Sequence, residues 1–437
     1  MGIDGGATLV RVDGGGRLGL TDGGGALGRT DGGGGCVRVE GAGGGPPGGG
    51  MVGRKARRAM RGLYRYGVRL HQENRVPASL VSAERARAPV VRCAAMQTAS
   101  ETSANAHSGE PLDAATALAA FRHMVRLRLL SARMVDLQRT EKVAFHASSL
   151  GEEAAIVGAT LAAREQDWVF PGTREWGAAI VRGMPIAAYV HHAFGTSHDP
   201  AKGHAAPDHP PARKVKVAPA SGVVGAHVPQ AVGAAWAAKI EKHDVATIAL
   251  FGEGATSTGD FHNALNFAGV FKTPCVLVCR NNGRAVSTPS ARQSRSESYA
   301  AKAIAYGVAS AKIDGIDVDA VLALVREAHA RAIAGKGTTL IEITTSPLDA
   351  AALSGGDLLA TSDRDPIARL RKTLERDKAI DPAGVDALVR ETNAEIDAAI
   401  AGAESAPRLA PSTLFDDVYS ELPVHLRAQK ESATWGR

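Results

Sequence analysis

An acidic residue and an amide residue follow two successive apolar segments, and both side chains supply oxygen ligands. Glu253 stands between two glycines after one apolar run, and Asn282 follows the next run, 29 residues later. If the two runs are parallel strands, their carboxyl ends meet at one edge of a sheet, beside the starts of the following helices. Carboxylate and amide oxygens bind Mg²⁺, and helix starts bind phosphate. The spacing therefore predicts a site for a divalent cation that carries a diphosphate.

Further groups that such a site needs lie beside these two residues. The backbone carbonyl of Arg284 offers a third protein ligand, while phosphates and water would supply the remaining oxygens around Mg²⁺. Gly254 and Ala255 offer unhindered backbone N–H groups to phosphate oxygens. Arg280 would add positive charge at the terminal phosphate.

Each half of this pattern has a simpler explanation when it is taken alone. The Gly252–Gly254 segment alone is best interpreted as an ordinary turn from a strand to a helix. The Asn281–Gly283 segment alone is best interpreted as a tight turn. Their combination, with each half directly after an apolar strand, is much more specific for a cation and diphosphate site.

The elements that must position these residues alternate between strands and helices. A long amphipathic helix is expected over 113–140, because apolar residues recur there with helical spacing. A second helix opens at 152–153, and a short strand and loop follow at 168–175. Alternation of strands with helices is typical of an α/β fold with a doubly wound parallel sheet and flanking helices. The expected strands are 245–251, 275–280, 308–313 and 338–344, and the expected helices around them are 228–242, 260–270, 299–307 and 317–334.

The chain before this domain has a different composition. Residues 1–50 hold 22 of the 50 glycines, and residues 51–95 are rich in arginine, so we expect a disordered extension over 1–95. Our hypothesis is that Met96 is the true start of translation. Residues 96–112 form a polar arm, 113–402 the α/β domain and 403–437 a C-terminal segment.

Charge and cysteine usage argue against several classes of protein. The net charge of +6 comes from residues 1–95, which carry 15 Lys/Arg and 7 Asp/Glu, so residues 96–437 have a net charge of −2. This distribution argues against nucleic-acid binding by the folded part. No apolar run approaches the roughly 20 residues of a membrane span. Cys275 and Cys279 share one face of a short strand and are expected to be buried, reduced thiols, which favours the cytoplasm.

Several longer motifs accompany the cation and diphosphate pattern. They include Gly151-Glu152-Glu153, Arg174-Glu175, Val228–Gly233, Gly259–His262 and Ala303–Gly307. With these motifs, the chain resembles the alpha subunit of thiamine-diphosphate-dependent 2-oxo acid dehydrogenases from about residue 113 to residue 430. The resemblance implies a thiamine diphosphate-binding fold, with thiamine diphosphate and Mg²⁺ as cofactors.

Within that family, the chain is more similar to the branched-chain (2-oxoisovalerate) type. Glu253 stands where chains of the pyruvate type usually carry Asp, and Cys279–Gly283 and Phe415–Tyr419 also match the branched-chain type. The resemblance implies oxidative decarboxylation of 2-oxo acids with acyl transfer to lipoyl groups. The alternatives are a pyruvate or acetoin dehydrogenase alpha subunit, and a cofactor-binding paralogue with weak activity.

The resemblance also assigns roles to individual residues. It implies that Mg²⁺ is held by Glu253, Asn282 and the carbonyl of Arg284. It implies diphosphate contacts from Arg174, Gly254, Ala255 and Arg280.

Two residues and two partners complete what the resemblance implies. Val224 stands where the family places an apolar residue that bends the cofactor, and His146 matches a region that lines the substrate channel. A beta subunit would grip the pyrimidine ring and supply the activating glutamate, so no residue of this chain is assigned as catalytic. Two alpha and two beta chains would assemble, and a lipoyl-bearing acyltransferase would accept the acyl group.

Three departures from the family pattern bear on activity. The segment after Thr344 lacks the histidines that the family carries there, and it is shorter. Thr173 replaces the usual Tyr before Arg174. Arg284 replaces an aromatic residue, although only its carbonyl is needed as a ligand. The missing histidines support the weakly active alternative.

Overall fold

The computed structural model describes residues 9–12, 18–21, 112–348, 358–359, 362 and 364–432, and the chain divides into Met1–Val91 and Arg92–Arg437. In the first unit, β1 (Leu9–Val12) and β2 (Leu18–Thr21) pair antiparallel, with Leu9 opposite Thr21. These strands lie in the extension over 1–95, for which disorder was expected. The rest of that extension and nearly all of the expected polar arm lie outside the described residues.

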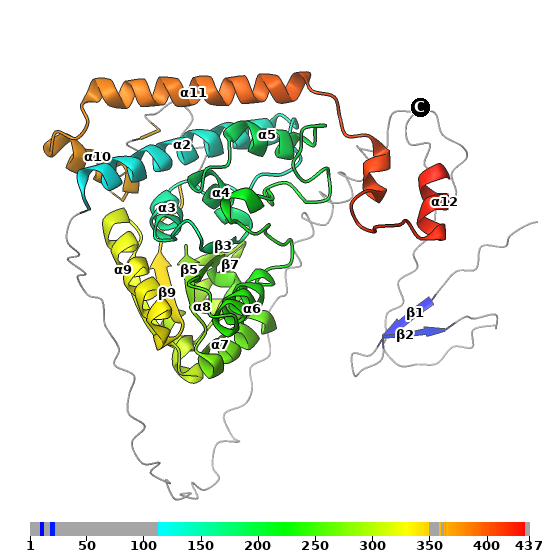
Figure 1. Ribbon diagram of the computed structural model, residues 1–437, viewed down its shortest axis with the longest axis horizontal. Helices are drawn as coiled ribbons and strands as arrows, with labels where there is room; N and C mark the ends of the chain where they lie inside the picture. The colour runs from blue at the N-terminus through cyan, green and yellow to red at the C-terminus, as the bar shows by residue number, and fades with distance from the viewer. Residues whose placement is uncertain are drawn as a thin grey trace, which may run out of the picture. The chain divides into compact units, whose positions relative to one another are not determined.

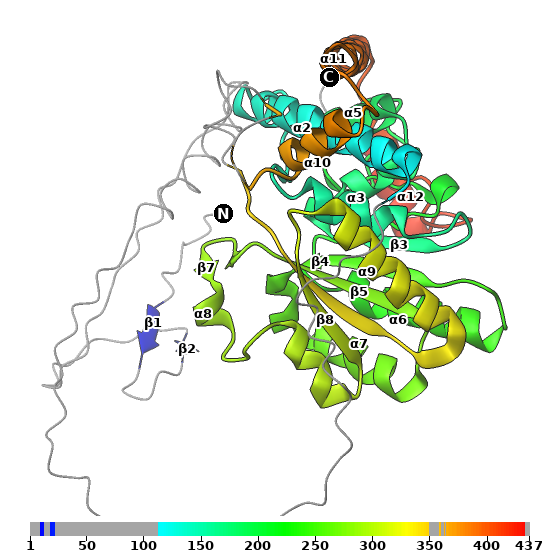
Figure 2. The same ribbon diagram turned by 90° about the vertical axis from the view of Figure 1, so that its left-hand side faces the viewer.

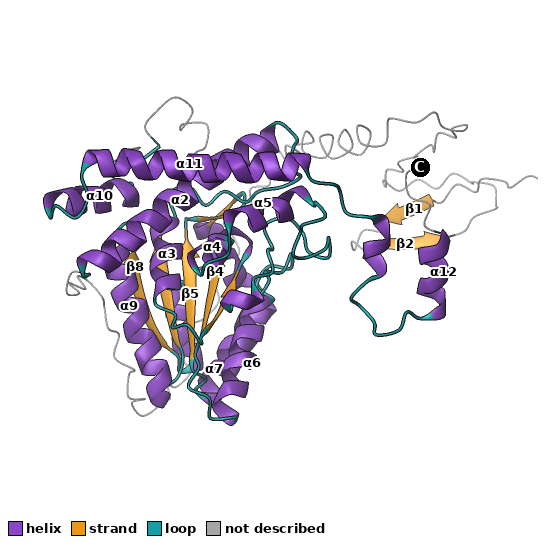
Figure 3. Ribbon diagram, turned by 45° about the horizontal axis from the view of Figure 1, so that its top comes forward, coloured by secondary structure: helices purple, strands orange, loops and turns teal. Residues whose placement is uncertain are grey.

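Five strands form a parallel sheet in the order β3-β4-β5-β9-β8 (Figures 1 and 3). The parallel sheet with flanking helices was predicted and is confirmed. The four strands expected from the apolar runs all form, and their ends agree within two residues. The strands are β3 (Trp168–Pro171), β4 (Thr247–Gly252), β5 (Cys275–Asn281), β8 (Ala309–Asp314) and β9 (Thr339–Thr344).

The sheet is buried on both faces because apolar side chains alternate along its strands. In β4, Ile248 and Leu250 enter one apolar cluster, whereas Ala249 and Phe251 enter the other. Helices α3 (Glu153–Leu161) and α9 (Val318–Arg331) cover the first face. Helices α6 (His227–Ile240) and α7 (Gly259–Phe271) cover the second (Figure 2). Glu253 and Asn282 thus follow strands that are packed against helices on both faces of the sheet.

A further layer of helices packs on the α3 side of the sheet. The long helix α2 (Ala114–Arg139) matches the expected span 113–140 closely, and Asp113 caps its start by accepting from the Thr116 N–H. Helix α11 (Pro382–Ser405) runs beside α2 and α5 (Figure 1), so the expected domain boundary at 402 falls inside a helix. The other helices of this layer are α4 (Gly177–Val181), α5 (Ile186–Phe194) and α10 (Pro366–Arg376).

The remaining elements are short. The expected helix at 299–307 is the 3-10 helix η4 (Ala300–Tyr306), and α4 and α5 were not expected from the sequence. The short hairpin β6 (Arg284–Ala285) and β7 (Thr288–Pro289) follows Asn282. The other elements are η1 (Thr173–Glu175), η2 (Arg213–Val215), η3 (Glu253–Ser257), α8 (Ser290–Gln293), η5 (Ala332–Lys336), η7 (Pro411–Phe415) and α12 (Val424–Ser432).

Two expectations from composition can be compared with the described residues. No helix described there is both long and apolar enough to cross a membrane. Cys275 and Cys279 are free, buried and on the same face of β5, as predicted. Burial raises the pKa of the Cys275 thiol to about 12.

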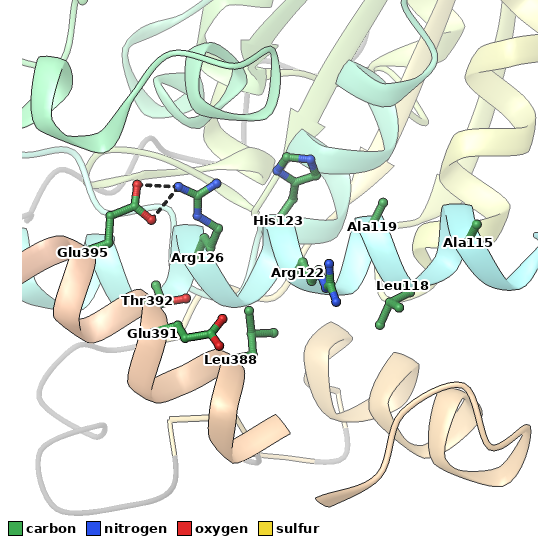
Figure 4. A pocket seen from close by; sticks show the side chains of 10 residues that line it. All are labelled: Ala115, Leu118, Ala119, Arg122, His123, Arg126, Leu388, Glu391, Thr392 and Glu395. Atoms are coloured by element: carbon green, nitrogen blue, oxygen red, sulfur yellow. Dashed lines mark hydrogen bonds and ion pairs between the residues drawn. The ribbon is translucent and has the colours of Figure 1, made fainter. Parts of the chain in front are cut away.

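A groove of about 630 Å³ separates α2 from α11 (Figure 4). Arg126 on α2 crosses one end of it to Glu395 on α11, with 2.7 Å between Nη2 and Oε1. His123 lies in its α2 wall, and its Nδ1 atom is buried without a partner among the described residues. Burial, followed by the positive charge of Arg126, lowers the pKa of His123 from 6.5 to about 4.

We expect His123 to make the protein sensitive to acid. A depressed folded-state pKa means that the contribution of His123 is fully present above pH 6.5 and is lost as the pH falls towards 4. The loss should be on the order of 1–3 kcal/mol, because the side chain keeps some solvent contact. Urea unfolding at pH 7 and pH 4.5 checks this. His123→Gln should lose less stability between the two pH values than the wild type, and an equal loss would contradict the assignment.

Candidate functional site

The carboxyl ends of neighbouring strands bring the predicted residues to one edge of the sheet. Gly252 of β4 lies opposite Arg280 of β5, so Glu253 and Asn282 leave adjacent strands. On one side, β3 leads into η1, which carries Arg174. On the other side, the last residue pair of β5 and β9 joins Asn281 to Thr344. This edge is where ligands bind in open α/β sheets.

Glu253 is the most unusual residue of this edge. It is 1% exposed, and its Oε1 atom has no hydrogen-bond partner among the described residues. Burial raises the pKa of its carboxyl, against the opposing effects of a backbone N–H at Asn282 and the positive charge of Arg174. A buried carboxylate oxygen without a partner is costly. A cation at this position would satisfy that oxygen.

The other two predicted cation ligands lie in the turn after β5. The Asn282 Oδ1 atom accepts a hydrogen bond from the Arg284 N–H at 3.1 Å, so the amide and the Arg284 backbone belong to one turn. Hairpin β6–β7 follows directly. A Cβ atom on Gly254 would lie 2.8 Å from the Ala285 Cβ, so only glycine lets this turn approach η3 so closely. No group of three or more His, Cys, Asp or Glu side chains in the described ranges could hold a metal, so a cation here depends on amide and carbonyl oxygens.

The phosphate-facing groups predicted in η3 lie at its start. Gly254 and Ala255 follow Glu253 directly, and the first N–H groups of a helical segment have no acceptor within it. Val224 lies in the loop before α6, and 62% of its surface is exposed. Its role in bending the cofactor stays a prediction.

Arg280, which the sequence predicted to contact the diphosphate, lies between two glutamates, and its phosphate contact stays a prediction. Its side chain is 1% exposed and holds two carboxylates, with Nη1 at 2.7 Å from Glu152 Oε2 and Nη2 at 2.5 Å from Glu175 Oε1. Burial alone would lower its pKa, but Glu152 and Glu175 raise it above the usual range. Both guanidinium amino groups therefore contact glutamates, while the buried Nε atom has no hydrogen-bond partner among the described residues.

Arg174 is more accessible than Arg280 to an incoming phosphate. Its side chain is 32% exposed, and its Nη2 atom lies 3.5 Å from Glu152 Oε1 and 4.0 Å from a Cβ position on Gly252. Burial and the neighbouring charge of Arg280 lower its pKa, while Glu152 opposes the shift. Arg174 is thus partly open to solvent, next to the turn that carries Glu253.

Glu152 and Glu175 were not singled out as site residues from the sequence. Both were visible only inside the longer motifs, and nothing in their local sequence shows that they meet Arg280. The pairing joins Glu152 to an arginine 128 residues further along the chain. The one signal in the sequence that could have identified them is an acidic residue within a segment of otherwise apolar or small residues.

His146 is buried among polar partners, and its expected place along a substrate channel stays a prediction. Its side chain has no exposed surface. Its Nε2 atom lies 2.9 Å from the Ser131 Oγ atom, and its Nδ1 atom lies 3.1 Å from the Tyr189 hydroxyl and 3.2 Å from Asp208 Oδ1. Tyr189 also donates to Asp208. The histidine therefore joins a buried polar network that fastens the loop around Asp208 to helices α2 and α5.

Two histidines of the 191–209 region, His192 and His209, are buried, at 3% and 5% exposure. His192 lies 2.8 Å from Asp199, and His209 lies 3.3 Å from the Thr173 hydroxyl. Thr173, which replaces the usual Tyr before Arg174, is thus held by a histidine from this loop.

The segment after β9 begins against the site. The Thr345 hydroxyl donates to Glu152 Oε1 at 2.8 Å, and the Thr345 N–H donates to the Asn281 carbonyl at 2.8 Å. Leu348 N–H donates to the Leu150 carbonyl. Residues 349–357 lie outside the described ranges, so the consequence of the missing histidines rests on the sequence alone.

Comparison with known proteins places these features in context. Residues 121–347 match the dehydrogenase E1 component family. The chain is 35% identical over 321 residues to the mitochondrial 2-oxoisovalerate dehydrogenase subunit alpha of Mus musculus, which covers 71% of this chain and 73% of that protein. The Homo sapiens protein of that name is 34% identical over 321 residues, with coverage of 71% and 72%. A pyruvate dehydrogenase E1 component subunit alpha of Staphylococcus aureus is 32% identical over 317 residues, with coverage of 70% and 83%.

Proposed function

Because the chain belongs to the dehydrogenase E1 component family, we propose that it is the alpha subunit of a branched-chain 2-oxo acid dehydrogenase. The observation that carries the proposal is the buried oxygen of Glu253 at the strand ends, which has no hydrogen-bond partner in the described ranges. It supports a cation at this position in a chain whose relatives are named as 2-oxo acid dehydrogenase subunits. The reaction is the oxidative decarboxylation of a 2-oxo acid with transfer of the acyl group to a lipoyl group.

The residues at the strand ends fit thiamine diphosphate and Mg²⁺. Glu253 has a free carboxylate oxygen, Asn282 an amide oxygen and Arg284 a backbone carbonyl for the cation. Arg174 presents positive charge at the partly open edge. When bound, thiamine diphosphate supplies the electron sink for decarboxylation. The work of this chain is to bind the diphosphate end, orient it and keep the Glu253 side free of water.

The substrate class rests on two observations. Glu253 stands between Gly252 and Gly254 where the pyruvate type usually carries Asp. The mouse and human relatives named for 2-oxoisovalerate are slightly more similar to the chain than the pyruvate relative from Staphylococcus aureus. Both support a branched-chain 2-oxo acid over pyruvate.

Partners and location are also part of the proposal. A beta subunit completes each active site in an assembly of two alpha and two beta chains, and a lipoyl-bearing acyltransferase accepts the product. We place the assembly in the cytoplasm. The reduced, buried state of Cys275 and Cys279 is consistent with that compartment. Fractionation of the native cells tests the location.

We expect the chain to copurify with a co-expressed beta subunit and to reduce an artificial electron acceptor in the presence of 2-oxoisovalerate. The reaction should require thiamine diphosphate and Mg²⁺. The ratio kcat/KM should be at least tenfold higher for 2-oxoisovalerate than for pyruvate, a difference of about 1.4 kcal/mol in transition-state binding. The two substrates are compared on one preparation, so that differences in subunit assembly do not affect the ratio of the two kcat/KM values.

Three outcomes separate the alternatives. A preference for pyruvate would contradict the branched-chain assignment and leave the family unchanged. Cofactor binding with no turnover of any 2-oxo acid would favour the weakly active paralogue, whose support is the histidine-free segment after Thr344. Failure to bind the cofactor would contradict the whole proposal.

A further inference from the structure

Glu152 connects the ends of three strands at the proposed site, although it belongs to none of them. It precedes helix α3 as its N-terminal cap residue and is 1% exposed. Its Oε2 atom lies 2.7 Å from Arg280 Nη1. Its Oε1 atom accepts from the Thr345 hydroxyl at 2.8 Å and lies 3.5 Å from Arg174 Nη2. One carboxylate therefore contacts Arg174, which follows β3, Thr345, which follows β9, and Arg280, which lies at the end of β5.

The charges around Glu152 explain why a carboxylate is needed there. Arg174 and Arg280 carry like charges and lie against the same carboxylate, with Nη2 of Arg174 3.5 Å from Glu152 Oε1 and Nη1 of Arg280 2.7 Å from Glu152 Oε2, so they repel each other. Glu152 lies against both guanidinium groups and compensates that repulsion. Glu175 bonds directly to Arg280, with 2.5 Å between its Oε1 atom and Nη2. Glu152 is thus the carboxylate whose two oxygens serve both arginines.

The two arginines differ in what they can still bind. Nη1 and Nη2 of Arg280 each contact a carboxylate and its side chain is 1% exposed, whereas the contact of Arg174 with Glu152 is long and its side chain is 32% exposed. An exposed arginine held loosely over a turn keeps donors available for an incoming anion. A carboxylate behind it fixes where those donors point.

We propose that Glu152 is a positioning residue for the diphosphate. It fixes the buried side chain of Arg280 and holds Arg174 at the partly exposed edge of the site, where Arg174 contacts a phosphate. The inference rests on the proposed function, because it needs a diphosphate at this edge. It assigns a role to the first acidic residue of the Gly151-Glu152-Glu153 motif. Glu152 itself touches neither the cofactor nor the substrate.

The next residue provides a matched control. Glu153 is also buried and also paired with an arginine, but it faces away from the site, towards Arg128, with 2.6 Å between Oε1 and Nε. Glu152→Gln and Glu153→Gln each remove one buried negative charge from a guanidinium group. Both should lower the stability of the protein. Only Glu152→Gln should affect the diphosphate site.

The test is the dissociation constant of thiamine diphosphate at saturating Mg²⁺, measured by calorimetry on the full chain copurified with its beta subunit. We expect Glu152→Gln to weaken binding at least tenfold and Glu153→Gln to change it less than twofold. Glu152→Asp, which keeps the charge on a shorter side chain, should fall between the wild type and Glu152→Gln. Thermal unfolding of each variant confirms that the compared samples are folded.

The direction of the change in affinity distinguishes a positioning role of Glu152 from a simple effect of its negative charge. Removal of a negative charge near a diphosphate would by itself tighten binding, so tighter binding by Glu152→Gln would overturn the inference. Equal affinities for Glu152→Gln and Glu153→Gln would also overturn it and leave the proposed function intact. No binding by the wild-type complex would overturn the proposed function and the inference together.

Discussion

Glu253→Ala is expected to abolish Mg²⁺-dependent binding of thiamine diphosphate. The dissociation constant should rise at least about 100-fold, which corresponds to about 2.8 kcal/mol of binding free energy. The reason is that Glu253 supplies the only carboxylate among the three proposed cation ligands, and its Oε1 atom has no other partner among the described residues. Calorimetric titration of the copurified complex measures the change.

The same position gives a second readout that does not need bound cofactor. Glu253→Gln keeps the size of the side chain and removes a charge that burial opposes, as the raised pKa of Glu253 shows. The cofactor-free variant should therefore unfold at a higher denaturant concentration than the cofactor-free wild type. The wild type should gain stability when cofactor and Mg²⁺ are added, and the variant should not. A variant that is less stable without cofactor, or that is stabilised by cofactor like the wild type, would remove Glu253 from the cation site.

Arg128→Met is expected to cost more stability than a typical single substitution. Arg128 is completely buried and binds two carboxylates, with 2.6 Å from Nε to Glu153 Oε1 and 2.8 Å from Nη1 to Asp365 Oδ2. Removal of the guanidinium would leave two negative charges buried without their cation, at a cost of about 3–5 kcal/mol. Because Asp365 also caps α10, the loss should loosen α2, α3 and α10 together.

A second arginine on the same helix provides the control for that experiment. Arg126 is also paired, with Glu395 at 2.7 Å, but both side chains are partly exposed. Arg126→Met should cost less than about 1 kcal/mol, as exposed ion pairs usually do. Urea unfolding of both variants gives the comparison. Equal losses for the two variants would contradict the role of the Arg128 network.

The sheet and the positions of Glu253 and Asn282 at its edge could be predicted from the sequence because the signals are local. Apolar runs such as Val245–Phe251 form strands in a buried parallel sheet, and Glu253 follows its strand directly. Adjacent pairing of β4 and β5 then places Asn282 beside it without further information. A short crossover through α7 makes that pairing the expected one.

The remainder of the site depends on contacts that the local sequence does not encode. Arg280 looked like a phosphate ligand because it precedes the Asn pair, but its nearest partners are Glu152 and Glu175, from distant segments. His146 looked like a channel residue and is enclosed by Tyr189 and Asp208. In both cases the side chain is fixed by tertiary packing rather than by its strand or turn.

Buried charged side chains serve two different purposes in this chain, stability in one place and ligand binding in another. Around Arg128 and Glu153, the charges compensate each other within the described residues and hold helices together. At Glu253, one carboxylate oxygen has no hydrogen-bond partner within the part of the chain that the structure describes. Such an imbalance is typical of a functional site, where stability is lowered so that a ligand can restore it.

Titration of the wild-type complex with thiamine diphosphate, with and without Mg²⁺, tests the central claim most directly. Heat of binding should appear with one cofactor per alpha chain in the presence of Mg²⁺, and it should disappear when the cation is removed with a chelator. Binding of the same affinity without any divalent cation would contradict the cation site at Glu253 and Asn282, and no binding in either condition would contradict the assignment of the cofactor.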